Sequence, residues 1–278
     1  MSLISRTVNL AEEYPFLGQD GAAPRLECHI QQYERLGEEI VRPAALILPG
    51  GSYTHHGLRE TTPVALEFMN EGYQAFVLYY SVTPHHYPQQ ILEVAAALDY
   101  IKKHFEHYRI DPERIVLIGF SAGGHLAACY SSFSLRPEVK RIIDPPRVGA
   151  VLLGYPLIYA QDVITLEAIE RFAGREHKND RELQRMSPGY NIRRTETPPT
   201  FLWHTNTDRV VSVESTLMYA RELIVAGVPT ELHLFPDGPH ALSTATRQTV
   251  KEPYGKIAYS VSSWVRLAKR WLENLFDL

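Results

Sequence analysis

Short aliphatic runs alternate along this chain with longer stretches of helical spacing. Continuous apolar runs of this kind are typical of strands that are buried on both faces of a sheet. Buried strands are predicted at Ala45–Leu48 and Ala75–Val82, and further strands at Ile115–Ile118, Gly149–Leu153, Thr200–His204 and Thr230–Phe235. Because helical stretches separate the runs, successive strands can point in the same direction, and we expect a mostly parallel central sheet.

Amphipathic stretches between the strands predict the helices. A crossover helix is expected over 62–72, where Pro63 occupies a first-turn position and Gly72 ends the apolar pattern. Apolar residues at three- and four-residue intervals predict helices over 91–101 and 257–275, and another is expected over Glu214–Ala226. The fold class is therefore α/β, with helices on both faces of the sheet.

Two stretches depart from this alternation. Leu26–Tyr33, in the amino-terminal third, is predicted to be an antiparallel edge strand. Residues 161–198 form a polar insertion between two strands, with a helical pattern around Ile164–Phe172. Such insertions often shape ligand pockets, so a small helical cap is the favoured interpretation; a surface loop without contact to substrate is the alternative. We expect one domain over residues 1–278, because no linker or repeat divides the chain.

The net charge of the chain limits the kinds of partner that we expect. Lysine and arginine number 28 against 32 acidic residues, a formal net charge of −4, and no basic stripe is present. We therefore expect no nucleic acid and no membrane as partner, and a small molecule as substrate. The first 16 residues lack the apolar core of a signal peptide, which predicts a cytoplasmic location. Two cysteines are too few for a disulfide framework, and whether the chain forms a homo-oligomer is left open.

The most informative motif is G-F-S-A-G-G-H at 119–125, which follows the apolar run Ile115–Ile118 and opens a helix-compatible stretch. A serine between a strand and a helix, with glycine two positions away on each side, is typical of a nucleophile elbow. The glycines permit a sharp turn that raises the serine hydroxyl above the sheet. Ser121 is therefore the predicted nucleophile.

A serine hydroxyl needs a neighbouring base and a group that orients that base. His240 is the preferred base, because its loop follows the strand predicted at 230–235. Asp208, just past the strand at 200–204, is the preferred acid, and the alternatives are Asp237 and Glu214. The order serine, aspartate, histidine is that of the α/β hydrolases, and differs from the order in chymotrypsin and subtilisin.

The oxyanion of an acyl-transfer intermediate needs N–H donors. The loop L-P-G-G-S-Y at 48–53 follows a buried strand, and its glycines let the backbone approach a reacting carbonyl. We predict that the N–H groups of Gly51, Ser52 and Ala122 are the donors; an ordinary glycine turn is the alternative. Weaker candidates, for contact with substrate, are Tyr53, Arg59 and Tyr155.

The remaining histidines carry weaker signals. Pairs at 55–56 and 85–86 could suggest a metal site, but adjacent side chains tend to point apart, and Glu60 is the one carboxylate nearby in sequence. We therefore expect no metal and no cofactor. His125 follows Ser121 in the same predicted helix, cannot easily reach back over the serine, and is expected to pack.

Several segments together carry a family resemblance: 48–53, R-E at 59–60, P-V-A at 63–65, G-Y at 72–73 with 75–82, 119–126 and 198–205. Over nearly its whole length the chain resembles the bacterial esterase/lipase branch of the α/β hydrolases, which is related to acetyl esterases and often labelled acetylxylan-esterase-like or sugar hydrolase. The resemblance implies a carboxylesterase for short acyl esters, including acetylated carbohydrate, with Ser121, Asp208 and His240 in the triad positions. The family's oxyanion loop usually reads H-P-G-G-G or H-G-G-G; here Leu48 replaces the histidine and Ser52 the last glycine.

Two other functions remain open. The same triad cleaves amides, so a serine peptidase or formamidase-like amidase is one alternative. A non-catalytic ligand receptor on the same scaffold is another, although such proteins often lack a member of the triad.

Overall fold

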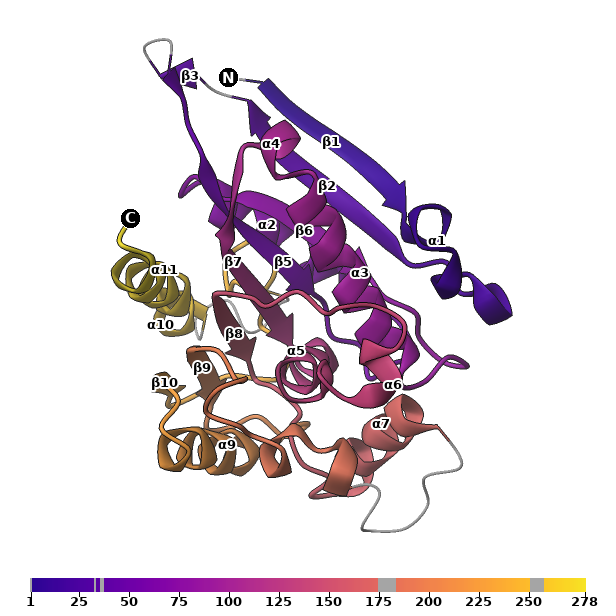
Figure 1. Ribbon diagram of the computed structural model, residues 1–278. Helices are drawn as coiled ribbons and strands as arrows, with labels where there is room; N and C mark the ends of the chain where they lie inside the picture. Colours follow the sequence, from indigo (N-terminus) through magenta and orange to yellow (C-terminus); the bar gives the residue numbers. More distant parts are fainter. Residues whose placement is uncertain (1, 33, 36–37, 175–183, 251–257) are drawn as a thin grey trace.

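A computed structural model of the protein describes residues 2–32, 34–35, 38–174, 184–250 and 258–278. Within these ranges eight strands form one sheet, in the order β1-β2-β6-β5-β7-β8-β9-β10 (Figure 1). The strands are β1 Ser2–Asn9, β2 Arg25–Gln32, β5 Arg42–Leu48, β6 Gln74–Tyr79, β7 Ile110–Phe120, β8 Ala150–Gly154, β9 Thr200–Thr205 and β10 Thr230–Phe235. A separate antiparallel pair joins β3 Glu34–Arg35 to β4 Glu38–Glu39.

The predicted parallel sheet is confirmed. Strands β5 to β10 run parallel to their neighbours among themselves, whereas β2 pairs antiparallel with both β1 and β6. The edge strand predicted at Leu26–Tyr33 corresponds to β2, and Tyr33 lies outside the described residues. The prediction for β7 was too short, because Ile110 pairs with Arg42 of β5 through the backbone before a register shift. That pairing needs no apolar side chain and leaves no hydrophobic signal.

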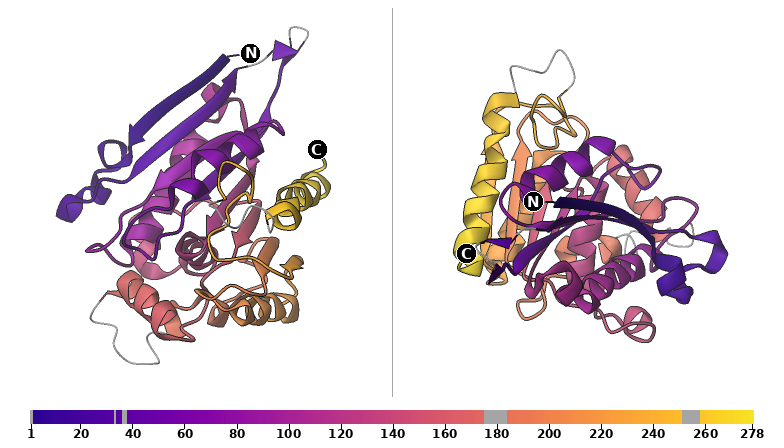
Figure 2. Two further views of the ribbon diagram at one scale, coloured as in Figure 1. Left: turned by 180° about the vertical axis from the view of Figure 1, so that it is seen from behind. Right: turned by 90° about the horizontal axis from the view of Figure 1, so that it is seen from above.

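Helices cover both faces of the sheet (Figure 2). The helices are α1 Leu10–Glu13, α2 Thr62–Met69, α3 Gln89–Lys103, α4 Phe105–Tyr108, α5 Ala122–Phe133, α6 Pro137–Lys140, α7 Val163–Ala173, α9 Val213–Val225, α10 Ala258–Val261 and α11 Ser263–Phe276. One face carries α3, α5 and α9, and the other carries α2 and α11. Short 3-10 helices lie at Pro15–Leu17, Gln19–Gly21, Leu58–Glu60 and Pro188–Tyr190. No described helix is both long enough and apolar enough to cross a membrane.

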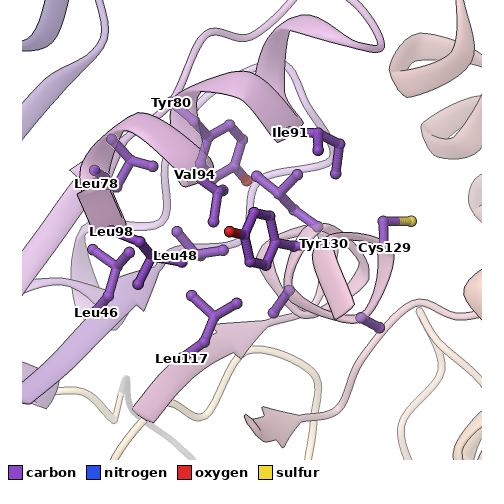
Figure 3. Packing of buried hydrophobic residues seen from close by; sticks show 14 of the residues in the cluster. Leu46, Leu48, Leu78, Tyr80, Ile91, Val94, Leu98, Leu117, Cys129 and Tyr130 are labelled. Atoms are coloured by element: carbon purple, nitrogen blue, oxygen red, sulfur yellow. The ribbon is translucent and has the colours of Figure 1, made fainter. Parts of the chain in front are cut away.

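Successive side chains of β5 point to opposite faces of the sheet and belong to two hydrophobic cores. Leu46 and Leu48 point to the face covered by α3 and α5, whereas Ala45 and Ile47 point to the face covered by α2. Figure 3 shows the first core, where these leucines meet Leu117 of β7 and side chains from both helices. Each fully buried leucine stabilises the fold by about 1.5–3 kcal/mol relative to an exposed one. The cores thereby fix the strand ends that carry the candidate site.

The carboxy-terminal helix differs from its prediction over 257–275. The structure divides it into α10 and α11 at Ser262, and Ile257 lies outside the described residues. The hydroxyl of Ser263 donates to the carbonyl of Ser260 at 2.6 Å. A serine side chain that bonds a nearby backbone carbonyl competes with the regular helical ladder, which gives a physical reason for the break.

The predicted strand Ala75–Val82 also ends early, at Tyr79, because the chain then turns toward a buried carboxylate of α3. Glu93 is fully buried, and its carboxylate accepts hydrogen bonds from the N–H of Ser81 at 2.6 Å and from Nε2 of Gln89 at 2.8 Å. Burial raises the pKa of Glu93 to about 7, although these hydrogen bonds act in the opposite direction.

The pKa of Glu93 predicts a pH-dependent stability. Because the folded-state pKa lies above the unfolded value of about 4.3, its stabilising contribution is complete below pH 4.3 and is lost as the pH rises through about 7. Between pH 5 and 8, wild type should lose on the order of 2 kcal/mol of unfolding free energy relative to Glu93→Gln. Urea unfolding of both proteins across this range measures the difference. The exposed control Glu106→Gln should show no such trend, and a pH-independent difference for Glu93→Gln would contradict the assignment.

Candidate active site

The carboxyl ends of the parallel strands meet at one edge of the sheet, and the predicted site residues gather there. Ser121 follows β7 directly, Asp208 lies in the loop after β9, and His240 lies in the loop after β10. The loop that carries Gly51 and Ser52 follows β5. This arrangement follows from the parallel direction of β5 to β10 and is the usual place for ligand sites in open α/β sheets.

The backbone at Ser121 has a strained conformation. Its φ of 51° and ψ of −117° lie in a region that side chains other than glycine rarely adopt. The turn requires close backbone approach on both sides: a Cβ at Gly123 would lie 2.1 Å from the carbonyl oxygen of Leu48, and one at Gly119 would lie 2.3 Å from that of Gly123. The N–H of Ser121 donates to the carbonyl of Gly154 at 3.1 Å. The glycines and the end of β8 together hold the strained turn in place.

The structure brings the three predicted triad side chains together. Ser121 Oγ lies 2.8 Å from His240 Nε2, and His240 Nδ1 lies 2.7 Å from Asp208 Oδ2. A carboxylate beside Nδ1 keeps the proton on that nitrogen and leaves Nε2 as an acceptor for the serine hydroxyl. The side chain of Asp208 is fully buried, whereas that of His240 retains 14% exposure. The arrangement can remove a proton from Ser121 and return it to a leaving group.

Asp208 accepts three hydrogen bonds and contacts a second histidine. Its Oδ1 accepts the N–H groups of Val210 and Val211 at 2.8 and 3.1 Å, while its Oδ2 accepts from His240 and lies 3.3 Å from Nε2 of His204. His204 Nε2 also faces the carbonyl of Val211 at 3.1 Å, so this nitrogen carries a proton. Burial alone would raise the pKa of Asp208, but the bonds from His204 and His240 lower it well below its usual range. The carboxylate is therefore ionised at neutral pH.

The alternative acids lie elsewhere. Asp237 is exposed and accepts a hydrogen bond from Thr207 Oγ1 at 2.5 Å. Glu214 is exposed in the first turn of α9. The structure thus places Asp208, and neither of these carboxylates, beside Nδ1 of His240.

The loop after β5 is also strained, with three consecutive positive φ values of 134° at Gly51, 52° at Ser52 and 59° at Tyr53. A Cβ at Gly51 would lie 1.9 Å from the carbonyl oxygen of His55. Ser52 adopts the left-handed region although it is not glycine, so the departure from the family's loop sequence does not prevent the turn. Within the described part of the chain, no acceptor pairs with the N–H groups of Gly51, Ser52 or Ala122.

The weaker candidates for substrate contact are engaged within the protein. Tyr53 is fully buried, and its hydroxyl lies 2.7 Å from Nδ1 of His125. Arg59 donates to the carbonyl of Thr249 at 3.0 Å. Tyr155 is 2% exposed, and its ring lies 5.0 Å from the imidazole of the predicted base, between centroids. The structure therefore places Tyr155 beside the triad, but does not place the Tyr53 hydroxyl at the surface.

His125 packs as expected. It is fully buried, and its Nε2 donates to the carbonyl of Met186 at 3.0 Å, which leaves Nδ1 to accept from Tyr53. His56 of the first histidine pair bonds the carbonyl of Tyr80 at 2.9 Å. Over the described ranges no group of three histidine, cysteine or acidic side chains is placed to hold a metal ion.

The insertion between β8 and β9 approaches the loop after β5. Helix α7 corresponds to the predicted helix around 164–172, while 175–183 lie outside the described residues. The ring of Phe172 lies 5.2 Å from Tyr53 and 4.9 Å from His125, between centroids. Arg171 Nη1 donates to the carbonyl of Ser52 at 3.5 Å. One side of α7 therefore packs directly against the loop after β5.

Sequence reasoning gave no role to two buried polar groups. His204 is predicted only as the end of a strand, and its position four residues before Asp208 is the available signal. Glu60 enters the sequence analysis only beside the histidine pairs and in the R-E segment, yet it is 3% exposed and accepts the N–H of Gly50 at 2.7 Å. No local pattern marks that bond, because it depends on how the loop folds back.

A mostly parallel sheet with a strained serine after β7, an aspartate after β9 and a histidine after β10 defines an α/β hydrolase. The comparisons with known proteins agree. The BD-FAE family model matches residues 33–223, and the chain belongs to this family.

Individual relatives and solved structures are also similar to this chain. Endo-1,4-beta-xylanase B of Butyrivibrio fibrisolvens is 30% identical over 243 residues, covering 84% of this chain and 37% of that protein. The carboxylesterase Cest-2923 of Lactobacillus plantarum WCFS1 has a TM-score of 0.83 at 28% identity, covering 99% and 98% of the two chains. An acetyl ester-xyloside bifunctional hydrolase of Caldicellulosiruptor lactoaceticus has a TM-score of 0.81 at 29% identity, covering 97% and 96%. The chain spans between 37% and 51% of the length of four curated relatives, the xylanase among them.

The close packing of the turn at Ser121 predicts that one added methyl group at Gly123 destabilises the protein. Gly123→Ala places a Cβ against backbone atoms that cannot rotate away, so it should lower the free energy of unfolding by more than about 3 kcal/mol and reduce activity. Gly18→Ala is the matched control, because its Cβ would meet its nearest atom at an ordinary 3.5 Å. Urea unfolding of both variants measures the effect, and equal stabilities would contradict the close approach described here.

Proposed function

We propose that this protein is a serine carboxylesterase that hydrolyses short-chain acyl esters with Ser121, His240 and Asp208 as its triad. The observation that supports this proposal best is the continuous hydrogen-bonded series from Ser121 Oγ through both nitrogens of His240 to Asp208. The names of the matched carboxylesterase and of the acetyl ester-xyloside hydrolase point to the same chemistry.

The mechanism is a two-step acyl transfer. His240 Nε2 takes the proton of Ser121 as Oγ bonds the ester carbonyl carbon, and the carbonyl oxygen becomes an oxyanion facing the N–H groups of Gly51 or Ser52 and of Ala122. The intermediate collapses, the bond to the alcohol oxygen breaks, and His240 protonates that oxygen. Water then repeats the sequence on the acyl-enzyme and releases the acid.

Acetylated carbohydrate is the substrate class we favour. Two matched proteins bear names that include a xylan or xyloside activity, and one of these names also includes an acetyl ester. We further propose that residues 161–198 act as a small cap on a single domain, because α7 packs against the oxyanion loop through Phe172 and Arg171. In this arrangement the insertion would limit the size of the acyl group beside Ser121.

Replacement of the nucleophile tests the reaction. Wild type should hydrolyse p-nitrophenyl acetate faster than the butyrate and the octanoate, and Ser121→Ala should lose at least about 10³-fold in kcat, because no other group can form the acyl-enzyme. Acetate release from an acetylated xylo-oligosaccharide, followed in parallel, tests the carbohydrate class. Full esterase activity in Ser121→Ala would refute the proposal. Labelling of Ser121 by a fluorophosphonate without any ester hydrolysis would favour an amidase, and absence of labelling would favour a receptor.

Paired aspartate variants test the assignment of the orienting acid. Asp208→Asn should lower kcat by about 10⁴-fold, because an amide beside Nδ1 no longer holds the required tautomer of His240. Asp237→Asn removes an exposed carboxylate from the neighbouring turn and should stay within about twofold of wild type. Steady-state kinetics with p-nitrophenyl acetate compare the two variants. A larger loss in Asp237→Asn than in Asp208→Asn would reverse the assignment.

A further inference from the structure

A second buried carboxylate lies beside the candidate site and has no part in the triad. Glu60 closes the 3-10 helix Leu58–Glu60 and is 3% exposed. Its Oε2 accepts the N–H of Gly50 at 2.7 Å, in the loop that carries the predicted oxyanion donors. Its Oε1 accepts the hydroxyl of Tyr155 at 2.5 Å. Both oxygens therefore accept hydrogen bonds from groups within the protein.

Tyr155 connects this carboxylate to the histidine loop. It follows β8 with a positive φ of 37°, and its N–H donates to the carbonyl of Trp203 at 2.8 Å. Its hydroxyl accepts the N–H of Ser243, three residues past His240, at 3.0 Å. The ring meets the imidazole of His240 edge-on, at 5.0 Å between centroids and an interplanar angle of 68°. One tyrosine therefore contacts both the base and the loop that carries it.

Ser243 completes the connection. Its hydroxyl donates back to the carbonyl of Arg59, next to Glu60, and its own carbonyl accepts Nε1 of Trp264 at 2.9 Å. Ser243 has a φ of 55°, so these bonds hold a conformation that a serine rarely adopts in isolation. The segments after β5, β8 and β10 are thus joined through buried hydrogen bonds behind the triad.

We propose that Glu60 and Tyr155 are positioning residues for ester hydrolysis, which hold the oxyanion loop and His240 in a fixed mutual position. The inference rests on the function proposed above. Oxyanion stabilisation and proton transfer must occur at the same carbonyl group, so the N–H donors and the imidazole must keep their relative positions during attack. Glu60 and Tyr155 are buried, and hydrogen bonds to Gly50, to Ser243 and between the two engage their polar groups, which suits these residues to position the site and not to bind substrate.

Burial sets the direction of the pKa of Glu60. It raises that pKa, although the bonds from Tyr155 and Gly50 and the charge of a protonated His240 act in the opposite direction. Asp208 supplies the direct partner of His240, so the part we assign to Glu60 is to hold Tyr155 and the loop after β5 in place.

Tyr155→Phe is the decisive variant, because it removes one hydroxyl and leaves the ring on His240. With p-nitrophenyl acetate, kcat should fall by about tenfold to a hundredfold while KM stays within about threefold. Glu60→Gln should behave alike, because an amide cannot accept from both donors. The double variant should be no slower than the slower single variant, since both residues belong to one unit. Tyr14→Phe is the control: it removes a part-buried bond of similar length, from the tyrosine hydroxyl to Asp99 Oδ2 at 2.6 Å, outside the site.

The outcomes separate this inference from the proposed function. A wild type that hydrolyses no ester refutes the function, and the inference with it. An active wild type with kcat in Tyr155→Phe within twofold of the Tyr14→Phe control would overturn the inference alone. A raised KM at unchanged kcat would also overturn it, because Tyr155 would then contact substrate. If Glu60→Gln fails to fold, Tyr155→Phe still decides the question.

Discussion

The strained backbone of Ser121 is the constraint on which the other features of the site depend. The turn requires the amino end of α5 to lie close to the end of β5. Only glycine at positions 119 and 123 leaves room for this approach, because a Cβ there would clash with backbone atoms. The same approach places the start of α5 against the first residues after β5, since a Cβ at Gly123 would lie 2.6 Å from the carbonyl oxygen of Pro49. Strain of this kind costs on the order of 1–3 kcal/mol and persists only where the surroundings determine it. The two hydrophobic cores and the bond from Ser121 to Gly154 provide those surroundings.

Much of the fold could be predicted from the sequence because its signals are local. Buried parallel strands leave continuous apolar runs, and each of the six predicted strands coincides with an observed one, including the edge strand β10, which alternates polar and apolar residues. The predicted ends of elements were wrong where hydrogen bonds, and not apolar side chains, determine where the element begins or ends. The first part of β7 pairs with Arg42 of β5, β6 ends as the chain reaches Glu93, and Ser263 accompanies the break between α10 and α11.

In the candidate site, too, residues with a local sequence signal could be predicted and residues without one could not. Ser121, Asp208 and His240 could be selected from the sequence because each follows a predicted strand, and parallel strands bring such positions together. The proximity of Glu60 to Tyr155 could not be predicted, because the two lie 95 positions apart and meet only after the loop following β5 has folded back. Contact of Tyr155 with substrate stays a prediction, and no local pattern indicates that its hydroxyl faces Glu60 in the interior.

Ser52 shows how the loop after β5 can be ordered before any substrate arrives. A glycine at this position would reach the left-handed conformation without strain, but it would also give the unfolded chain, and a loosened loop, more conformations. Serine restricts those alternatives, and Arg171 bonds its carbonyl from α7. The dipoles of the loop are then aligned in the resting protein, so little reorganisation free energy would remain to be supplied when negative charge develops beside them.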